Sequence, residues 1–174
     1  AGSPVAKENR IVFVVPVVKP DQLVVPANLH PYVFRTASNT TIEGRSAAEI
    51  MAKWKVKRVA TMSQDYAFGQ DVTRAFVTHL KKLRPDIEIV DQQWPKLGEA
   101  DYTPFINAQL AKKPDAWIGM NATAVAVPVG PKVGATDLPT FSLASPDEVV
   151  KSGPSGGDNI FLVYGGKLLP PPLS

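Results

Sequence analysis

Short runs of β-branched and other apolar residues alternate along the chain with longer stretches of helical spacing. The apolar runs predict strands at 10–15, 32–36, 58–63, 87–93, 116–120, 140–143 and 159–164. Such alternation is typical of a parallel sheet whose strands are joined by crossover helices. The pattern therefore predicts an α/β fold, with a Rossmann-like parallel sheet and flanking helices.

Two of the intervening stretches have a clear apolar face, at 47, 50, 51 and 54 and at 72, 76, 80 and 83. Thr40 with Glu43 has the spacing of a capping box, as has Ser145 with Glu148, and Asp101 is placed to cap a later helix. Prolines and a glycine interrupt the helix expected at 122–134. Three consecutive prolines predict a tail at 167–174.

Charge and composition exclude several classes of function. The 19 basic and 16 acidic residues are interspersed, which is typical of a solvated surface and argues against a nucleic-acid partner. The absence of cysteine excludes disulfides and thiolate chemistry. No apolar run approaches the length of a membrane span, so we expect no direct membrane insertion. His30 and His79 have no ligand-like partners nearby, so we expect surface histidines and no metal site.

The sequence contains no constellation that predicts catalysis. Gly153, Ser155 and Gly157 match the G-x-S-x-G pattern of hydrolases, but a predicted helix precedes them and a strand follows, the reverse of the required order. No glycine-rich nucleotide loop of either common pattern occurs. We therefore expect a binding protein without a cofactor rather than an enzyme.

In open parallel sheets, ligands bind outside the C-terminal ends of the strands, beside helix N-termini. The stretches that follow predicted strands are 16–19, 36–38, 63–68, 121–123 and 144–147. The candidate ligand-binding residues from these stretches are Lys19, Thr36, Tyr66, Phe68, Asn121, Ser145 and Asp147. Simpler roles remain open for some of them. Tyr66 and Phe68 could be packing residues. Ser145 could be a helix cap, and Asp147 could complement the helix dipole. Against packing, the apolar face of the following helix is already supplied without Tyr66 and Phe68.

Four short motifs follow one another in the segment 32–115. They are F-R-T at Phe34–Thr36, D-Y-x-x-G at Asp65–Gly69, D-Y at Asp101–Tyr102 and P-D at Pro114–Asp115. In this order and at this spacing, the segment resembles the branched-chain amino acid (Leu/Ile/Val) binding proteins of ABC importers, a family of type I periplasmic binding proteins. The match covers roughly half of the chain and becomes weaker beyond about residue 122.

The resemblance implies a protein of two lobes, of which this chain is a fragment. Residues 1–37 would be a remnant of the first lobe that includes a crossover strand, 38–165 the second lobe, and 166–174 a tail. It implies a solute-binding component that holds a small carboxylate-bearing solute, such as an amino acid, and delivers it to the membrane permease of an ABC importer. The implied location is periplasmic, or extracellular and lipid-anchored in a bacterium without an outer membrane.

Matching to the family position by position assigns solute contacts to Ser3, in a hydroxyl-rich loop, to Phe68, and to Asp147, which would hold an ammonium group. Phe68 stands where the family often has tyrosine, and Lys19 where amino acid binders tend to have a small hydroxyl residue. Both departures argue against a plain aliphatic amino acid. Two alternatives are a ligand-sensing domain of the same fold in a signalling protein and, with less support, a Rossmann-like enzyme.

Overall fold

The computed structural model describes residues 2–16, 19, 21–119, 140–142, 160–164 and 167–168 of the chain. Its elements in order are α1 (Gly2–Asn9), β1 (Phe13–Val15), the 3-10 helix η1 (Asp21–Val24), β2 (Val33–Arg35), α2 (Thr40–Met51), β3 (Arg58–Met62), α3 (Ala67–Leu83), β4 (Glu88–Gln93), α4 (Thr103–Ala111), β5 (Ala116–Gly119), β6 (Thr140–Ser142), β7 (Ile160–Tyr164) and β8 (Lys167–Leu168). Each predicted strand is present, with slightly shorter bounds. The predicted α/β fold with a parallel sheet is confirmed.

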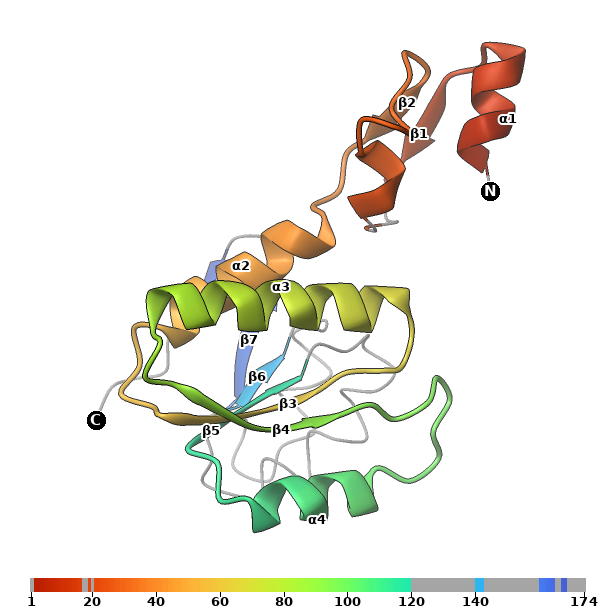
Figure 1. The fold of residues 1–174 in the computed structure, drawn as a ribbon. Helices are drawn as coiled ribbons and strands as arrows, with labels where there is room; N and C mark the ends of the chain where they lie inside the picture. Colours follow the sequence, from red (N-terminus) through yellow and green to blue (C-terminus); the bar gives the residue numbers. More distant parts are fainter. Residues whose placement is uncertain are drawn as a thin grey trace.

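The strands form two sheets, which Figure 1 shows as a small N-terminal unit and a larger body. β1 and β2 pair in parallel, and the other six strands have the order β4-β3-β5-β6-β7-β8. All neighbours from β4 to β7 are parallel, whereas β8 is antiparallel to β7. The strand at Lys167–Leu168 shows that the prediction of a tail was wrong for these two residues, because their backbone pairs with β7.

The C-terminal ends of three strands lie side by side at one edge of the large sheet. Met62 of β3 pairs with Gly119 of β5, which pairs with Ser142 of β6. This is the edge at which parallel sheets bind ligands, and among the described residues Ser63 follows one of these ends. Several positions singled out in the sequence lie outside the described residues: Met120, Leu143, the 145–148 capping box, the 122–134 stretch and the Gly153–Gly157 loop.

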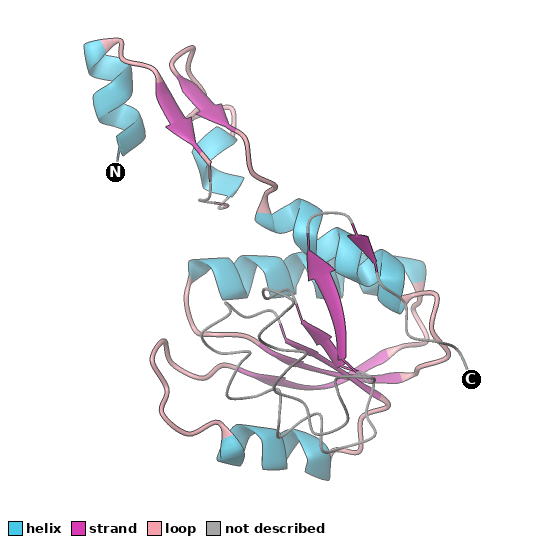
Figure 2. Ribbon diagram, turned by 180° about the vertical axis from the view of Figure 1, so that it is seen from behind, coloured by secondary structure: helices cyan, strands magenta, loops and turns pink. Residues whose placement is uncertain are grey.

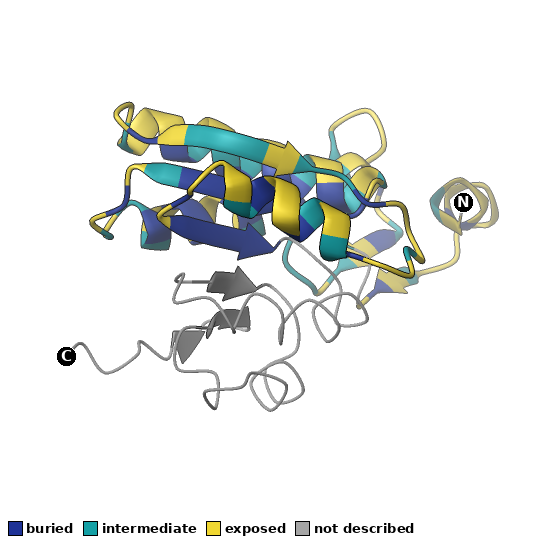
Figure 3. Ribbon diagram, turned by 90° about the horizontal axis from the view of Figure 1, so that it is seen from below, coloured by how far each residue is buried: buried dark blue, intermediate teal, exposed yellow. Residues whose placement is uncertain are grey.

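Helices cover both faces of the large sheet, α2 and α3 on one side and α4 on the other (Figures 1 and 2). Because side chains alternate along a strand, each central strand supplies both layers of core. Val59 and Ile118 pack with α2 and α3, whereas Met62 and Trp117 pack with α4. β5 is buried throughout, and β3 is buried from Val59 to Met62, as expected of central parallel strands (Figure 3).

The apolar face predicted for α3 is correct over most of its length. Val72, Phe76 and Leu80 are fully buried, but Leu83 is 39% exposed. Leu83 is the last residue of the helix, where the chain turns away toward β4, so this part of the prediction was wrong. Within the described residues, no helix is both long and apolar enough to cross a membrane.

The N-terminus of α2 differs from the predicted capping box. Asn39 is the N-cap, and its side chain accepts a hydrogen bond from the backbone N–H of Ile42 at 2.7 Å. Thr40 is already helical, and the Glu43 carboxylate turns away to meet Lys19. At α4, which begins at Thr103, Asp101 accepts from the backbone N–H of Thr103 at 2.9 Å, while the N-cap position itself falls on Tyr102.

Polar contacts join the N-terminal unit to the start of α2. One oxygen of Asp21, Oδ2, accepts hydrogen bonds from the hydroxyls of Thr40, at 2.8 Å, and Thr41, at 2.6 Å. The backbone N–H of Thr40 donates to the carbonyl of Lys19 at 3.2 Å. Lys19 and Asp21, which follow β1, are therefore bound to the first turn of α2 and link the small sheet to the large one.

Candidate functional site

Residues from the two sheets meet at their C-terminal strand ends. Lys19 follows β1, and Phe68 lies in the first turn of α3, directly after β3. The Lys19 Nζ atom is 5.9 Å from the centroid of the Phe68 ring, within range of a cation–π interaction. The Tyr66 ring lies 5.9 Å from that of Phe68, centroid to centroid, at an angle of 35°. The structure thus brings together three of the predicted site residues.

The turn that carries the two aromatic residues is tight because of Gly69. A Cβ at this position would collide with the backbone carbonyl of Gln64, so a larger residue would force the turn open. The backbone N–H of Tyr66 donates to the same carbonyl at 2.8 Å, and Gln70 Nε2 donates to Asp65 Oδ1 at 2.6 Å. The glycine of the D-Y-x-x-G motif is therefore explained by the tight turn between β3 and α3.

Tyr66 is partly buried in this turn. Desolvation of its phenol raises the pKa of Tyr66 above the ordinary value of 10.0. The hydroxyl therefore stays protonated at neutral pH and is available as a hydrogen-bond donor.

Lys19 is held by an acid that the sequence argument had assigned to capping. Its Nζ lies 2.5 Å from Glu43 Oε1, and the Ser38 hydroxyl donates to the same oxygen at 2.6 Å. The other oxygen, Glu43 Oε2, is buried and has no hydrogen-bond partner in the described part of the chain. Glu43 belongs to the site but was missed, because an acid three residues after a threonine at a helix start has the capping-box spacing whatever it contacts in space.

Phe68 also takes part in the core. It is partly buried and packs against the cluster formed by α2, α3, β3 and β5. The expectation that the core does not need Phe68 was therefore wrong. The reason is that the first turn of α3 lies over the sheet and not beyond its end, so a side chain at this position reaches both the strand ends and the core.

The remaining predicted residues have other partners or are not described. Ser3 lies in α1 and not in a loop, and its hydroxyl is 2.9 Å from Nε2 of His30. Thr36 extends the small sheet, because its backbone N–H donates to the carbonyl of Val15 at 3.3 Å. Asn121, Ser145 and Asp147 lie outside the described residues.

His30 is only 8% exposed, so the expectation of a surface histidine was wrong. Besides the contact of Nε2 with Ser3, its Nδ1 atom accepts from the backbone N–H of Tyr32 at 3.3 Å. A histidine with both ring nitrogens hydrogen-bonded can be buried at little cost. His79 is partly exposed and pairs with Glu49 at 2.8 Å.

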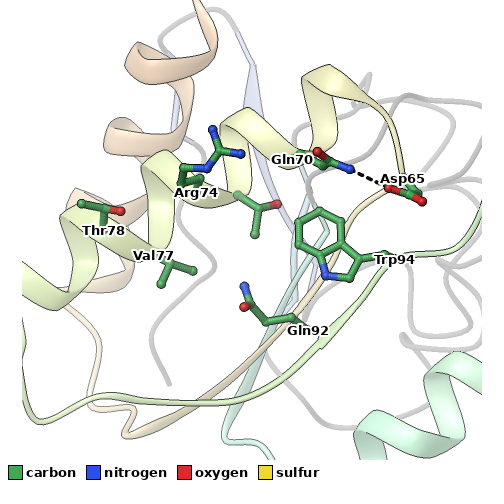
Figure 4. Close-up of a pocket in the computed structure, with 8 residues that line it drawn as sticks. Asp65, Gln70, Arg74, Val77, Thr78, Gln92 and Trp94 are labelled. Atoms are coloured by element: carbon green, nitrogen blue, oxygen red, sulfur yellow. Dashed lines mark hydrogen bonds between the residues drawn. The ribbon is translucent and has the colours of Figure 1, made fainter.

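A cavity of about 480 Å³ lies elsewhere, between α3 and the C-terminal end of β4 (Figure 4). Its lining residues are Asp65, Gln70, Thr73, Arg74, Val77, Thr78, Gln92 and Trp94. It lies beside β4, an edge strand of the large sheet, and its lining does not include Lys19, Tyr66 or Phe68. The junction between the two sheets is the better candidate for a solute site, because strand ends from both sheets converge there.

Comparison with known proteins places the chain in a family. A family model described as periplasmic binding protein matches residues 1–163. The chain belongs to the periplasmic binding protein family. The match spans nearly the whole sequence, which confirms the resemblance drawn from the four motifs between Phe34 and Asp115. Comparison with curated protein sequences gives no match.

Solved structures of this family share the fold. A solute-binding protein from R. palustris in complex with benzoate is 22% identical, with a TM-score of 0.78 over 92% of this chain. A branched-chain amino acid ABC transporter protein from Thermus thermophilus with bound valine is 16% identical, with a TM-score of 0.75 over 92% of this chain. A related protein from Rhodospirillum rubrum is 20% identical, with a TM-score of 0.72 over 92% of this chain.

The chain spans 44%, 42% and 46% of the length of these three proteins. This periplasmic binding protein chain therefore matches less than half the length of each of the three structures. At these levels of identity, the likeness establishes the type I fold.

Proposed function

We propose that this chain is part of the solute-binding component of an ABC importer, which holds a small carboxylate-bearing solute between two lobes. Residues 1–37 would belong to the first lobe and residues 38–165 to the second, as the sequence predicts. The solute would lie at the junction of the two sheets. The role is reversible binding, without chemistry on the solute.

The observation that carries this proposal is the contact of Lys19 with Phe68. A cation from the end of one sheet and an aromatic ring from the end of the other face each other where parallel sheets bind ligands. An ammonium group has three N–H donors, and the pair with Glu43 uses one of them in the described part of the chain. Lys19 can therefore donate to a solute carboxylate while Phe68 and Tyr66 pack against its apolar part.

Known ligands of two relatives support this class of solute. The R. palustris protein binds benzoate and the Thermus thermophilus protein binds valine, and both molecules carry a carboxylate on a compact apolar group. By analogy, Asn121, Ser145 and Asp147 remain proposed contacts from the second lobe, and Ser3 and Thr36 from the first. The partner would be a membrane permease, and the location would be periplasmic or extracellular.

A thermal-shift screen of amino acids, aromatic acids and their neutral amides tests the proposal on a full-length protein that contains this chain. A solute at 100 times its dissociation constant stabilises the protein by about 2.7 kcal/mol, which is readily seen as a rise in Tm. We expect at least one carboxylate to raise the Tm, its amide to have less effect, and Lys19→Met to reduce the shift. Equal shifts from a carboxylate and its amide would contradict the role given to Lys19.

A further inference from the structure

We propose that the cavity between α3 and β4 is a second binding site, which takes an uncharged sugar ring and is separate from the proposed solute site. Asp65 and Gln70 line this cavity, whereas Tyr66 and Phe68 of the same turn lie at the junction of the two sheets. The proposal therefore concerns side chains that the proposed function does not use.

The size and shape of the cavity suit a small molecule. Its volume of about 480 Å³ lies within the range of roughly 300 to 1,000 Å³ that is common for small-molecule sites. Figure 4 shows Arg74, Val77 and Thr78 along α3 on one side, and Gln92 and Trp94 at the end of β4 on the other. A ligand would lie between the helix and the strand end, with room for a sugar ring and its substituents.

Trp94 gives the cavity a flat apolar wall. It directly follows β4 and is partly buried, as is Val77 on the helix side. The indole also supplies one N–H donor at the edge of its ring. A pyranose ring is complementary to such a wall, because its C–H bonds form an apolar face and its hydroxyls lie around the rim.

The charges of the lining cancel. Asp65 and Arg74 are its two charged residues, and Arg74 is already paired with Asp71 at 3.0 Å. An anion in the cavity would meet the Asp65 carboxylate, and a cation would meet the Arg74 guanidinium, whereas an uncharged ligand avoids both repulsions. The other polar groups of the lining are amides and hydroxyls, which donate and accept hydrogen bonds as sugar hydroxyls do.

A peptide that extends the sheet fits this edge less well than a sugar. β4 is an edge strand, and such strands can pair with an added strand. Its register against β3 is irregular, however, because Val59 pairs with Ile89 and Ala60 with Asp91, so that Val90 is passed over. A bulge of this kind bends the strand and interrupts the regular spacing that a further strand would need.

The first test is an NMR titration of the full-length protein that contains this chain with glucose, maltose, cellobiose and lactose. The indole N–H signal that Trp94→Phe removes belongs to Trp94, and we expect at least one of these sugars to move it saturably. Glucuronate and, at slightly acidic pH, glucosamine resemble glucose but carry one negative or one positive charge. Each should bind about tenfold more weakly than glucose, because its charge meets a like charge in the lining.

Three variants test the lining, with dissociation constants from saturation-transfer NMR, which observes the sugar. Trp94→Ala removes the apolar wall and should weaken sugar binding by about tenfold. Gln92→Met, at an exposed position, keeps the side-chain length but removes the amide, so we expect a loss of about fivefold. It carries the test if Trp94→Ala lowers the Tm too far. Leu97→Ala, at a position that is 67% exposed and outside the lining, is the matched control and should bind sugar normally.

Several results would overturn the sugar site. They are a Trp94 signal that none of the sugars moves, charged sugars that bind as tightly as glucose, and a loss in Leu97→Ala equal to that in Trp94→Ala. A blocked peptide of alternating valine and threonine that moves the Trp94 signal where the sugars do not would assign the edge to a peptide instead. Thermal shifts with carboxylates report the junction of the two sheets, so failure of the sugar site leaves the proposed function standing, and the reverse holds too.

Discussion

Phe68 serves both the core and the proposed site, so its two roles have to be separated by substitution. Phe68→Ala should lower the free energy of unfolding by about 1 to 3 kcal/mol, less than the roughly 3 to 5 kcal/mol typical of a fully buried phenylalanine. It should weaken solute binding as well. Phe68→Leu retains most of the packing but removes the ring face under Lys19, so we expect nearly normal melting with reduced affinity. Normal affinity in both variants would assign Phe68 to packing alone.

A second residue-scale prediction concerns the pKa of Asp86. A hydrogen bond from the Arg84 guanidinium lowers the pKa of this carboxyl from 3.8 to about 2. Because the folded-state pKa is depressed, the pair stabilises the fold above the unfolded-state value near 4, and that contribution is lost as the pH falls toward 2. The carboxyl signal of Asp86 in an NMR titration should therefore have its midpoint near pH 2.

The matching control is Arg84→Gln, which should return the midpoint of Asp86 toward 4. Arg84 also donates to the carbonyls of Ala52 and Trp54, so this variant alters the 52–56 loop as well, but the titration reports the carboxyl directly. A midpoint near 4 in the unaltered protein would contradict the ion pair.

At the scale of elements, α2 packs closely against α3 at Gly44. A Cβ added at Gly44 would lie 2.5 Å from the carbonyl oxygen of Val72 and 2.8 Å from the backbone nitrogen of Phe76. These are backbone atoms, which cannot move without shifting α3. The absence of a side chain at Gly44 therefore determines how close the two helices lie.

Gly44→Ala should lower the free energy of unfolding by about 1 to 3 kcal/mol, the usual cost of overpacking. In a solvated helix the same change would stabilise by about 1 kcal/mol, so the sign itself is diagnostic. Ser46→Ala, at an exposed position of the same helix, is the control and should be neutral or stabilising. Urea denaturation of both variants checks the prediction, and a stabilised Gly44→Ala would contradict the close approach.

At the scale of the whole molecule, we expect the junction of the two sheets to be the hinge and one wall of the proposed cleft. Asp21 and the Lys19 carbonyl are hydrogen-bonded to the first turn of α2, so the two sheets are joined at this point. A solute between two such units draws them together, as in hinge closure.

In a protein of the relatives' length that contains this chain, saturating solute should therefore reduce the radius of gyration in small-angle X-ray scattering. Lys19→Met should require more solute for the same change, because one wall loses its charged contact. Ser46→Ala, at an exposed position of α2, serves as the control for solute affinity. An unchanged radius at saturation would contradict closure.

The sequence by itself determined where β1 to β7 lie along the chain, because apolar runs of β-branched residues and their alternation with helical stretches are local patterns; it did not predict β8. It also determined the family, through motifs whose reasons are local, such as the tight turn at Gly69. The spacing of apolar residues also predicted the buried face of α3. The exception is Leu83, which is exposed because the chain changes direction at the end of the helix.

Only the tertiary structure decided which polar side chains meet. Glu43 has the spacing of a capping box but lies against Lys19, which is 24 positions away along the chain, and His30 is buried because Ser3, 27 positions away, contacts its ring. Phe68 belongs to core and site together because the first turn of α3 lies over the sheet. Contacts between distant positions depend on how the elements pack, and spacing along one element carries no information about them.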